Sequence, residues 1–287
     1  MNRLILVSLT TLLLCSPGAG QQPQPSPGPL TFYYDYTVLP GKEEELMTLV
    51  RTVGAPVRDK LMADGVVLAW GLETPLLRYP GGPTHVIWFS VANLEGVEKV
   101  LNGMEAQLAK LAAEEAKAAE TARSSKQKPA MTTAERQRET FDMSKTRDWL
   151  TRDIVFGYGS PPPAGTLPVT RYNFVKVRPG KGLDYRRAWE KYNKPVYDKL
   201  VADHVVLAYG LAVEEVKTDG DFTNFIWIAC ANMAALEKVG PAFTADRNKR
   251  SEEERTAIAE LFATLTEPDK NRSVVARSRI FKVQEEK

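Results

Sequence analysis

PVRDKLMADGVVLAWGL occupies residues 56–72, and PVYDKLVADHVVLAYGL occupies residues 195–211. The two stretches are identical at 13 of 17 positions and lie 139 residues apart. Aligned without a gap, residues 31–100 match residues 170–239 at 28 of 70 positions, whereas chance would give about 6 % identity. Solenoid repeats are much shorter and need at least about three copies. We therefore interpret the pattern as one domain that is present twice.

The repeat continues into the last predicted strand of each copy with a different spacing. Those strands are expected at residues 149–156 and 274–281, and the residue pairs that match are Arg147 with Arg272, Arg152 with Arg277 and Phe156 with Phe281. Their separation is 125 residues, so the first copy carries 14 additional residues. We place these in a solvated helical extension at residues 112–123, where the apolar stripe dissolves into Ala, Glu and Lys.

Each copy is predicted to fold in the order β-α-β-β-α-β. The strands that precede 149–156 in the first copy are expected at residues 31–38, 66–72 and 85–91, because these runs are rich in β-branched and aromatic residues. The second strand is apolar on both faces, whereas a sheet that is covered on one side only would show a polar face. We therefore expect the two sheets to pack against each other, with the helices outside.

The ends of the helices have their own signals. Pro56 predicts an interruption near Gly54, and Gly65 suits a left-handed helix end. Asn93 is expected to cap the second helix of the first copy. Two capping boxes are predicted, Thr132-x-x-Glu135 and Ser251-x-x-Glu254.

Several of these motifs together resemble the dimeric α/β-barrel superfamily. They are the aromatic first strand, Pro-Gly-Lys before the first helix, Ala-Asp-Gly followed by Val-Val-Leu-Ala-Trp-Gly, and the Ile-Trp strand. The family includes antibiotic-biosynthesis monooxygenase-like, NIPSNAP-like and ethyl tert-butyl ether degradation-type proteins. The resemblance covers residues 31–158 and 170–283 and implies an α+β fold. Two tandem ferredoxin-like units would form a barrel-type pseudo-dimer within one chain. Because members range from cofactor-free oxygenases to haem enzymes and isomerases, the fold does not select a function.

The N-terminal residues are predicted to be a targeting segment. Arg3, the apolar run Leu4–Leu14 and the small residues at 18–20 predict a signal peptide cleaved near Gly20, hence export to the periplasm or the exterior. A lipid anchor at Cys15 is the alternative, but Leu14 stands where a small residue is expected. The apolar run is too short to span a bilayer, so no membrane span is predicted.

The resulting division has five parts. They are the signal peptide (1–20), a Pro- and Gln-rich tether (21–30), the first ferredoxin-like repeat with its extension (31–160), a linker (161–168) and the second repeat (169–287).

Composition excludes several function classes. The chain has 38 Lys and Arg against 36 Asp and Glu, so it lacks the basic field that nucleic-acid binding requires, and no nucleic acid is expected as a partner. Cys230, the one cysteine left after cleavage, is expected to be a buried apolar residue. His85 and His204 are too few for a His-rich metal site, so no metal is predicted. No cofactor is predicted; haem stays open, with these two residues as its only histidine ligands.

Positions where the two copies differ in polarity are candidates for an added function. His204 aligns with Gly65 and precedes a strand in which Tyr209 replaces Trp70. Our hypothesis is a cleft in the second copy with His204 at its rim as the catalytic candidate, lined by Tyr172, Tyr192, Tyr209 and Trp227. The alternative is that the aromatic residues pack in the core and that His204 serves a turn with positive φ. His85, which aligns with Asn224, has the same two interpretations.

Two function classes remain at this point. The symmetric aromatic residues favour an exported module that binds a small apolar or aromatic ligand or a partner. A polar constellation kept in only one copy would favour a cofactor-light monooxygenase- or isomerase-like enzyme that acts on a small organic molecule. The sequence does not decide whether the protein is an enzyme, and it leaves ligand identity and oligomerisation open.

Overall fold

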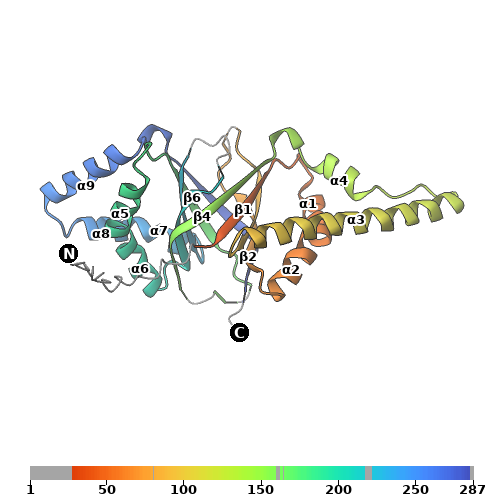
Figure 1. Cartoon of the computed structure of the whole chain (residues 1–287), viewed down its shortest axis with the longest axis horizontal. Coiled ribbons are helices and arrows are strands. Elements are labelled where there is room, and N and C mark those ends of the chain that lie inside the picture. Colours follow the sequence, from red (N-terminus) through yellow and green to blue (C-terminus); the bar gives the residue numbers. More distant parts are fainter. Residues whose placement is uncertain (1–27, 80, 160–161, 164, 217–221, 285–287) are drawn as a thin grey trace, which may run out of the picture.

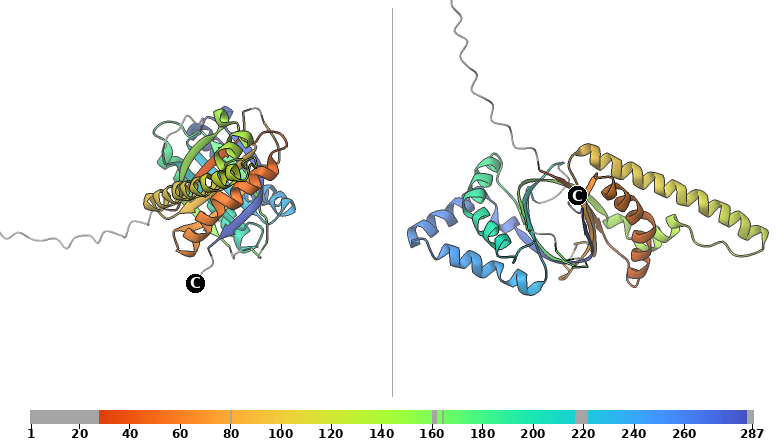
Figure 2. Two further views of the ribbon diagram at one scale, coloured as in Figure 1. Left: turned by 90° about the vertical axis from the view of Figure 1, so that its right-hand side faces the viewer. Right: turned by 90° about the horizontal axis from the view of Figure 1, so that it is seen from below.

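The strands close into one antiparallel barrel. The structure is a computed structural model, and it describes residues 28–79, 81–159, 162–163, 165–216 and 222–284. The predicted signal peptide and most of the tether lie outside the described residues. Around the barrel the strands follow the order β1-β3-β2-β8-β5-β7-β6-β4. Figure 2 shows the barrel end-on, with helices on two opposite sides.

Each half of the chain contributes four neighbouring strands. The first half supplies β1 (Leu30–Tyr36), β2 (Val67–Pro75), β3 (His85–Val91) and β4 (Arg147–Tyr158). The second half supplies β5 (Val169–Val175), β6 (Ala208–Glu214), β7 (Asn224–Cys230) and β8 (Arg272–Val283). Both halves have the ferredoxin-like strand order. Backbone pairing of β2 with β8 and of β4 with β6 joins the two halves. The two sheets, which were expected to pack against each other, are therefore also hydrogen-bonded to each other along both edges and form one barrel.

The helices cover the outside of the barrel. The first half has α1 (Glu43–Leu49), the π-helical η1 (Val50–Gly54), α2 (Ala55–Ala63), α3 (Leu94–Ser124), α4 (Thr133–Thr140) and the 3-10 turn η2 (Met143–Lys145). The second half has α5 (Gly182–Tyr192), α6 (Lys194–Ala202), α7 (Met233–Glu237), α8 (Val239–Arg247), α9 (Glu252–Leu265) and η3 (Pro268–Lys270). Figure 1 shows the end of α3 projecting away from the barrel, which confirms the predicted helical extension.

The predicted helix ends are confirmed. Asn93 Oδ1 accepts a hydrogen bond from the backbone N of Gly96 at 3.0 Å, and both capping boxes are formed. Gly65 ends its helix with a φ of +78°, and His204 occupies the aligned turn with a φ of +56°. The interruption at Pro56 takes the form of the π-helical turn η1, which leads directly into α2.

Two apolar layers lie between the barrel and its helices. In the first half Trp70 is fully buried, and its Nε1 donates to Asp59 Oδ1 on α2 at 3.0 Å. In the second half Tyr209 is fully buried, and its hydroxyl donates to Asp198 on α6. The two aspartates thus hold equivalent helices on equivalent strands. Cys230 is buried in the second layer, as expected, and burial raises the pKa of its thiol to about 11.

The interior of the barrel is more polar than the sequence predicted. Aromatic rings fill much of it, such as Tyr33 stacked on Trp149 with centroids 3.9 Å apart. Buried polar side chains lie among them: Thr31, Glu73, Thr151, Asp153, Thr170 and Ser278. The expectation of purely apolar strands fails because β2 continues beyond Leu72 and carries a carboxylate inward.

Each junction between the halves carries one buried carboxyl group. Glu73 on β2 pairs in register with Ser278 on β8, and Asp153 on β4 pairs in register with Ala212 on β6. In the repeat alignment, Glu73 corresponds to Ala212 and Asp153 to Ser278. The carboxyl groups therefore occupy non-equivalent strands at the two junctions.

Candidate functional site

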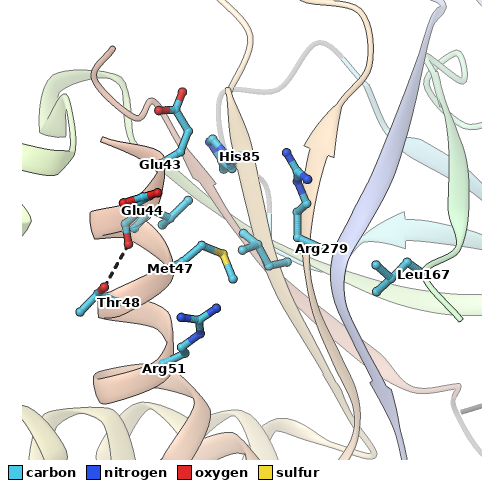
Figure 3. Close-up of a pocket in the computed structure, with 10 residues that line it drawn as sticks. Glu43, Glu44, Met47, Thr48, Arg51, His85, Leu167 and Arg279 are labelled. Atoms are coloured by element: carbon cyan, nitrogen blue, oxygen red, sulfur yellow. Dashed lines mark hydrogen bonds between the residues drawn. The ribbon is translucent and has the colours of Figure 1, made fainter. Parts of the chain in front are cut away.

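A cleft of about 540 Å³ lies between α1 and the outer faces of β2, β3 and β8 (Figure 3). Its floor is apolar, and its sides carry both signs of charge. The lining residues are Glu43, Glu44, Leu46, Met47, Thr48, Arg51, Leu72, His85, Leu167 and Arg279. The Glu-rich first turn of α1 places two carboxylates at the positive end of the helix, where the backbone dipole favours them.

His85 is the buried titratable group of this cleft. It is 7 % exposed, at the first position of β3. Its Nδ1 lies 3.0 Å from Thr84 Oγ1, which also accepts from the backbone N of Val38 at 2.8 Å. Burial lowers the pKa of His85 to about 4, partly opposed by the Glu43 carboxylate. The ring is therefore neutral at physiological pH.

The hydrogen bond to Thr84 fixes which ring nitrogen serves the cleft. The Thr84 hydroxyl has a single hydrogen, which it can give either to the Tyr36 carbonyl at 3.2 Å or to Nδ1 of His85. With either choice Nδ1 is engaged. Nε2, which has no hydrogen-bond partner in the described part of the chain, is the nitrogen left for a ligand.

Charged groups around His85 are not neutralised by one another. Within the described ranges, Glu43, Arg51 and Arg279 form no ion pair. Figure 3 shows Arg51, on η1 directly after α1, on one side of the cleft and Arg279 of β8 on the other. The guanidinium of Arg279 near the neutral imidazole, with that of Arg51 farther along the cleft, can hold a negatively charged oxygen while Nε2 exchanges a proton with the bound molecule.

This constellation exists in one half only. His85, Glu43, Arg51 and Arg279 align with Asn224, Gly182, Glu190 and Ile154. The supporting scaffold is nevertheless the same in both halves, since Thr223 Oγ1 accepts from the backbone N of Val177 at 2.8 Å and lies 3.1 Å from Asn224 Oδ1. The fold therefore does not require the histidine or the charges of the first half.

The five residues of the sequence hypothesis do not share a cleft. Tyr172 and Trp227 belong to the barrel interior, where Trp227 Nε1 donates to Asp153 at 2.8 Å. Tyr209 lies in the outer layer under α6, and Tyr192 packs beside it near Phe262. His204 is exposed on its turn. Their separation follows from strand alternation, which sends Tyr172 inward and Tyr209 outward.

Sequence reasoning identified His85 as a candidate but missed its neighbours. Comparing the two copies for polar differences also singles out Arg51 and Arg279, because Glu190 and Ile154 replace them. Glu43 could have been found in the same way. The placement of Arg279 beside His85 depends on the pairing of β2 with β8, which no local pattern indicates.

Other kinds of site find no support in the described residues. They contain no group of three or more His, Cys, Asp and Glu side chains placed to hold a metal ion. His85 lines this cleft, whereas His204 lies exposed on a turn, so His85 would be the histidine available to bind a haem in this cleft. None of the helices described has the length and apolar character needed to cross a membrane.

Comparison with known proteins supports the fold alone. No protein-family model matches the chain, and no curated protein matches its sequence. Among solved structures, a putative monooxygenase from Fusobacterium nucleatum has a TM-score of 0.56 at 8 % identity, covering 90 % of this chain and 95 % of its own. A putative monooxygenase from Lactobacillus acidophilus has a TM-score of 0.55 at 10 % identity, with coverages of 90 % and 97 %. An anthrone oxidase-like protein has a TM-score of 0.50 at 12 % identity, with coverages of 90 % and 94 %. The chain therefore shares the dimeric α/β-barrel fold of these proteins.

Proposed function

We propose that the first half is the active half of a cofactor-light enzyme, which binds a small organic molecule in the α1 cleft and transfers a proton through His85. The observation that carries this proposal is the restriction of His85, Glu43, Arg51 and Arg279 to one half of an otherwise repeated scaffold. If both halves served only to stabilise the fold, the first half would not need these four charged or titratable residues. The oxidase and monooxygenase descriptions of the structural neighbours agree with it.

The chemistry that suits the cleft is removal of an acidic proton from an aromatic or carbonyl compound. The His85 ring is neutral, so only one of its two nitrogens carries a hydrogen. When that hydrogen is on Nδ1, where it is donated to Thr84 Oγ1, Nε2 is free to accept the proton of the substrate. The negative charge that develops on the substrate oxygen would be stabilised by Arg51 and Arg279. Met47 and Leu72 supply apolar contacts for the body of the molecule. Molecular oxygen would serve as the oxidant: the carbanion bonds to O2, the proton held by His85 completes a C–OOH group, and loss of water leaves a carbonyl.

Replacing His85 by Asn, the residue of the second half, tests the proposal. With anthrone as the probe and oxygen uptake as the readout, we expect turnover to fall by about 100-fold or more, because proton transfer loses its acceptor. The fold should persist, since Asn224 occupies the same scaffold. Wild-type turnover should be flat between about pH 5 and 8 and should fall below pH 4, where His85 becomes protonated.

Binding without turnover is the second candidate function, and the apolar floor of the cleft favours it. In that case ligands would raise the melting temperature of the wild type and of His85→Asn alike, and no compound would be consumed.

Equal turnover by the wild type and by His85→Asn would contradict the role of His85 in proton transfer. Arg279→Ile provides the matched variant for the charge, because Ile154 is the aligned residue.

Two further proposals concern the whole chain. We infer from residues 1–20 that the protein is exported and that its signal peptide is removed near Gly20. N-terminal sequencing of the native protein should then begin close to Gln21; an intact Met1 would contradict export. We also infer that the two halves arose by duplication and act as an intramolecular pseudo-dimer, an inference that the 28 identities and the shared strand order support.

A further inference from the structure

Arg58 on α2 is a buried cation that forms no ion pair within the described ranges. It is 2 % exposed, and its Nε has no hydrogen-bond partner. Its guanidinium makes no ion pair or hydrogen bond with the residues that the structure describes. A buried charge is normally paired, because the loss of hydration is costly. Burial accordingly lowers the pKa of Arg58, although an arginine stays protonated at any physiological pH.

The surroundings of Arg58 compensate its charge only weakly. Its Cζ lies 5.6 Å from the ring of Trp70 and 5.9 Å from the ring of Tyr34, both near the outer limit for a cation–π contact. The adjacent carboxylate of Asp59 is already engaged by Trp70 Nε1 at 3.0 Å and by Lys282 Nζ at 2.7 Å. The guanidinium therefore retains its hydrogen-bond donors for another group.

The chain makes room for this guanidinium. Gly54 lies one turn before Arg58, in the π-helical η1. A Cβ atom at Gly54 would lie 2.2 Å from Nη1 of Arg58. The glycine thus leaves the space in which the charged group sits.

The second half carries its arginine in this layer on the strand and not on the helix: Arg171 on β5 interacts electrostatically with Tyr197, and its Nε has no hydrogen-bond partner. Tyr197 is the residue aligned with Arg58, and Asn193 is aligned with Gly54. Tyr197 is buried and stacks on Tyr209 with centroids 5.0 Å apart. Phe32 is the residue aligned with Arg171, so the aromatic ring and the arginine exchange places between helix and strand in the two halves.

We propose that Arg58 anchors a buried anion site in the layer beneath α2, which takes a small monocarboxylate with an aromatic or apolar body. The fork of a guanidinium matches a carboxylate with two parallel hydrogen bonds. The rings of Tyr34 and Trp70 suit an aromatic body. The nearby cation Lys282, which lies 5.2 Å from the Trp70 ring, is already paired with Asp59. It is therefore not available to neutralise a second negative charge, so a ligand with one negative charge is favoured.

The position of the site separates it from the His85 cleft. Arg58 does not line that cleft. Tyr34 and Tyr36 on β1, which interact with the guanidinium, are partly exposed. The anion site can therefore be tested independently of the proposed enzyme activity.

Titration calorimetry with benzoate tests the anion site, with neutral benzamide and sodium chloride at equal ionic strength as controls. We expect benzoate to bind the wild-type protein and benzamide not to bind. Arg58→Tyr, which installs the residue of the second half, should weaken benzoate binding at least about tenfold, the value of a hydrogen bond to a charged group. Glu98→Ala, on the exposed face of α3, is the control and should leave benzoate binding unchanged within about twofold.

Gly54→Ala provides a second variant that keeps the charge. Its Cβ should displace the guanidinium and weaken benzoate binding, while alanine supports the helix better than glycine. This variant decides the matter if Arg58→Tyr does not fold. The proposal is overturned if the wild type binds no benzoate, or if Arg58→Tyr or Gly54→Ala binds it as tightly as the wild type does.

Discussion

Replacement of Glu73 by Ala is expected to lower the free energy of unfolding by about 2–4 kcal/mol. Glu73 is 1 % exposed inside the barrel and accepts three hydroxyl hydrogen bonds. The donors are Tyr172 Oη at 2.5 Å, Thr170 Oγ1 at 3.1 Å and Ser278 Oγ at 3.4 Å. Alanine would leave these hydroxyl groups buried without their acceptor and would open a cavity at the junction of β2 and β8.

Urea unfolding of a matched set of variants measures this effect. Glu73→Gln keeps the shape and an acceptor oxygen, so it should cost less than about 1.5 kcal/mol. Glu98→Ala, on the exposed face of α3, serves as the control and should change stability by less than about 0.5 kcal/mol. A loss from Glu73→Ala no larger than that of the control would show that the interior hydroxyl groups do not depend on this carboxyl group.

Replacement of Asp153 by Asn is expected to stabilise the protein at pH 8 by a few kcal/mol. Burial raises the pKa of Asp153 to about 7, although Trp227 Nε1 donates a hydrogen bond to it. From its ordinary value of 3.8, this rise corresponds to about 4 kcal/mol between the two protonation states. Asparagine keeps the acceptor for Trp227 and cannot ionise.

The sign of the pH dependence follows from linkage. Between pH 4 and pH 7 the folded protein holds a proton on Asp153 that the unfolded chain has released, so folding stability falls as the pH rises. The wild type should therefore be more stable at pH 5 than at pH 8. Asp153→Asn should flatten this slope and leave the contributions of Glu73, whose pKa burial also raises, and of Asp35, whose pKa burial raises to about 6.

Guanidinium unfolding at pH 5, 6.5 and 8 measures the slope. Asp184→Asn on the exposed face of α5 is the control and should leave the slope unchanged. A pH dependence of Asp153→Asn equal to that of the wild type would show that Asp153 is not the group that titrates. Tyr33 and Tyr158 face the same carboxyl group, but their raised pKa values keep them neutral throughout this range.

Local signals were sufficient to predict the elements of the fold. The caps at Asn93, Thr132 and Ser251 act within one turn, and so sequence spacing identifies them. The helix interruption at Pro56 follows from a missing N–H. The internal repeat then supplied the long-range arrangement, since two copies of one unit have complementary sheet edges to pair.

The candidate site could be predicted only in part. His85 was visible as a polar difference between the copies, but the same reasoning gave His204, which lies exposed on a turn. Arg58 looks like an ordinary surface residue of an amphipathic helix in the sequence. The aligned Tyr197 is buried as well, so this position faces the barrel in both halves, which an arginine in the sequence does not indicate. The side chain of Glu73 points into the barrel because β2 extends to Pro75, whereas the sequence predicted a strand that ends at Leu72.

The placement of the two interior carboxyl groups also determines which halves can associate. If two copies of the first half closed a barrel together, Glu73 of one copy would face Asp153 of the other in register at both junctions, four carboxyl groups in one enclosed chamber. If two copies of the second half did so, Ala212 would face Ser278 at both junctions and leave each one underfilled. Only the mixed pairing sets one carboxyl group against one small residue at each junction. The two halves of this chain are therefore complementary at both junctions, and neither half can serve as a substitute for the other.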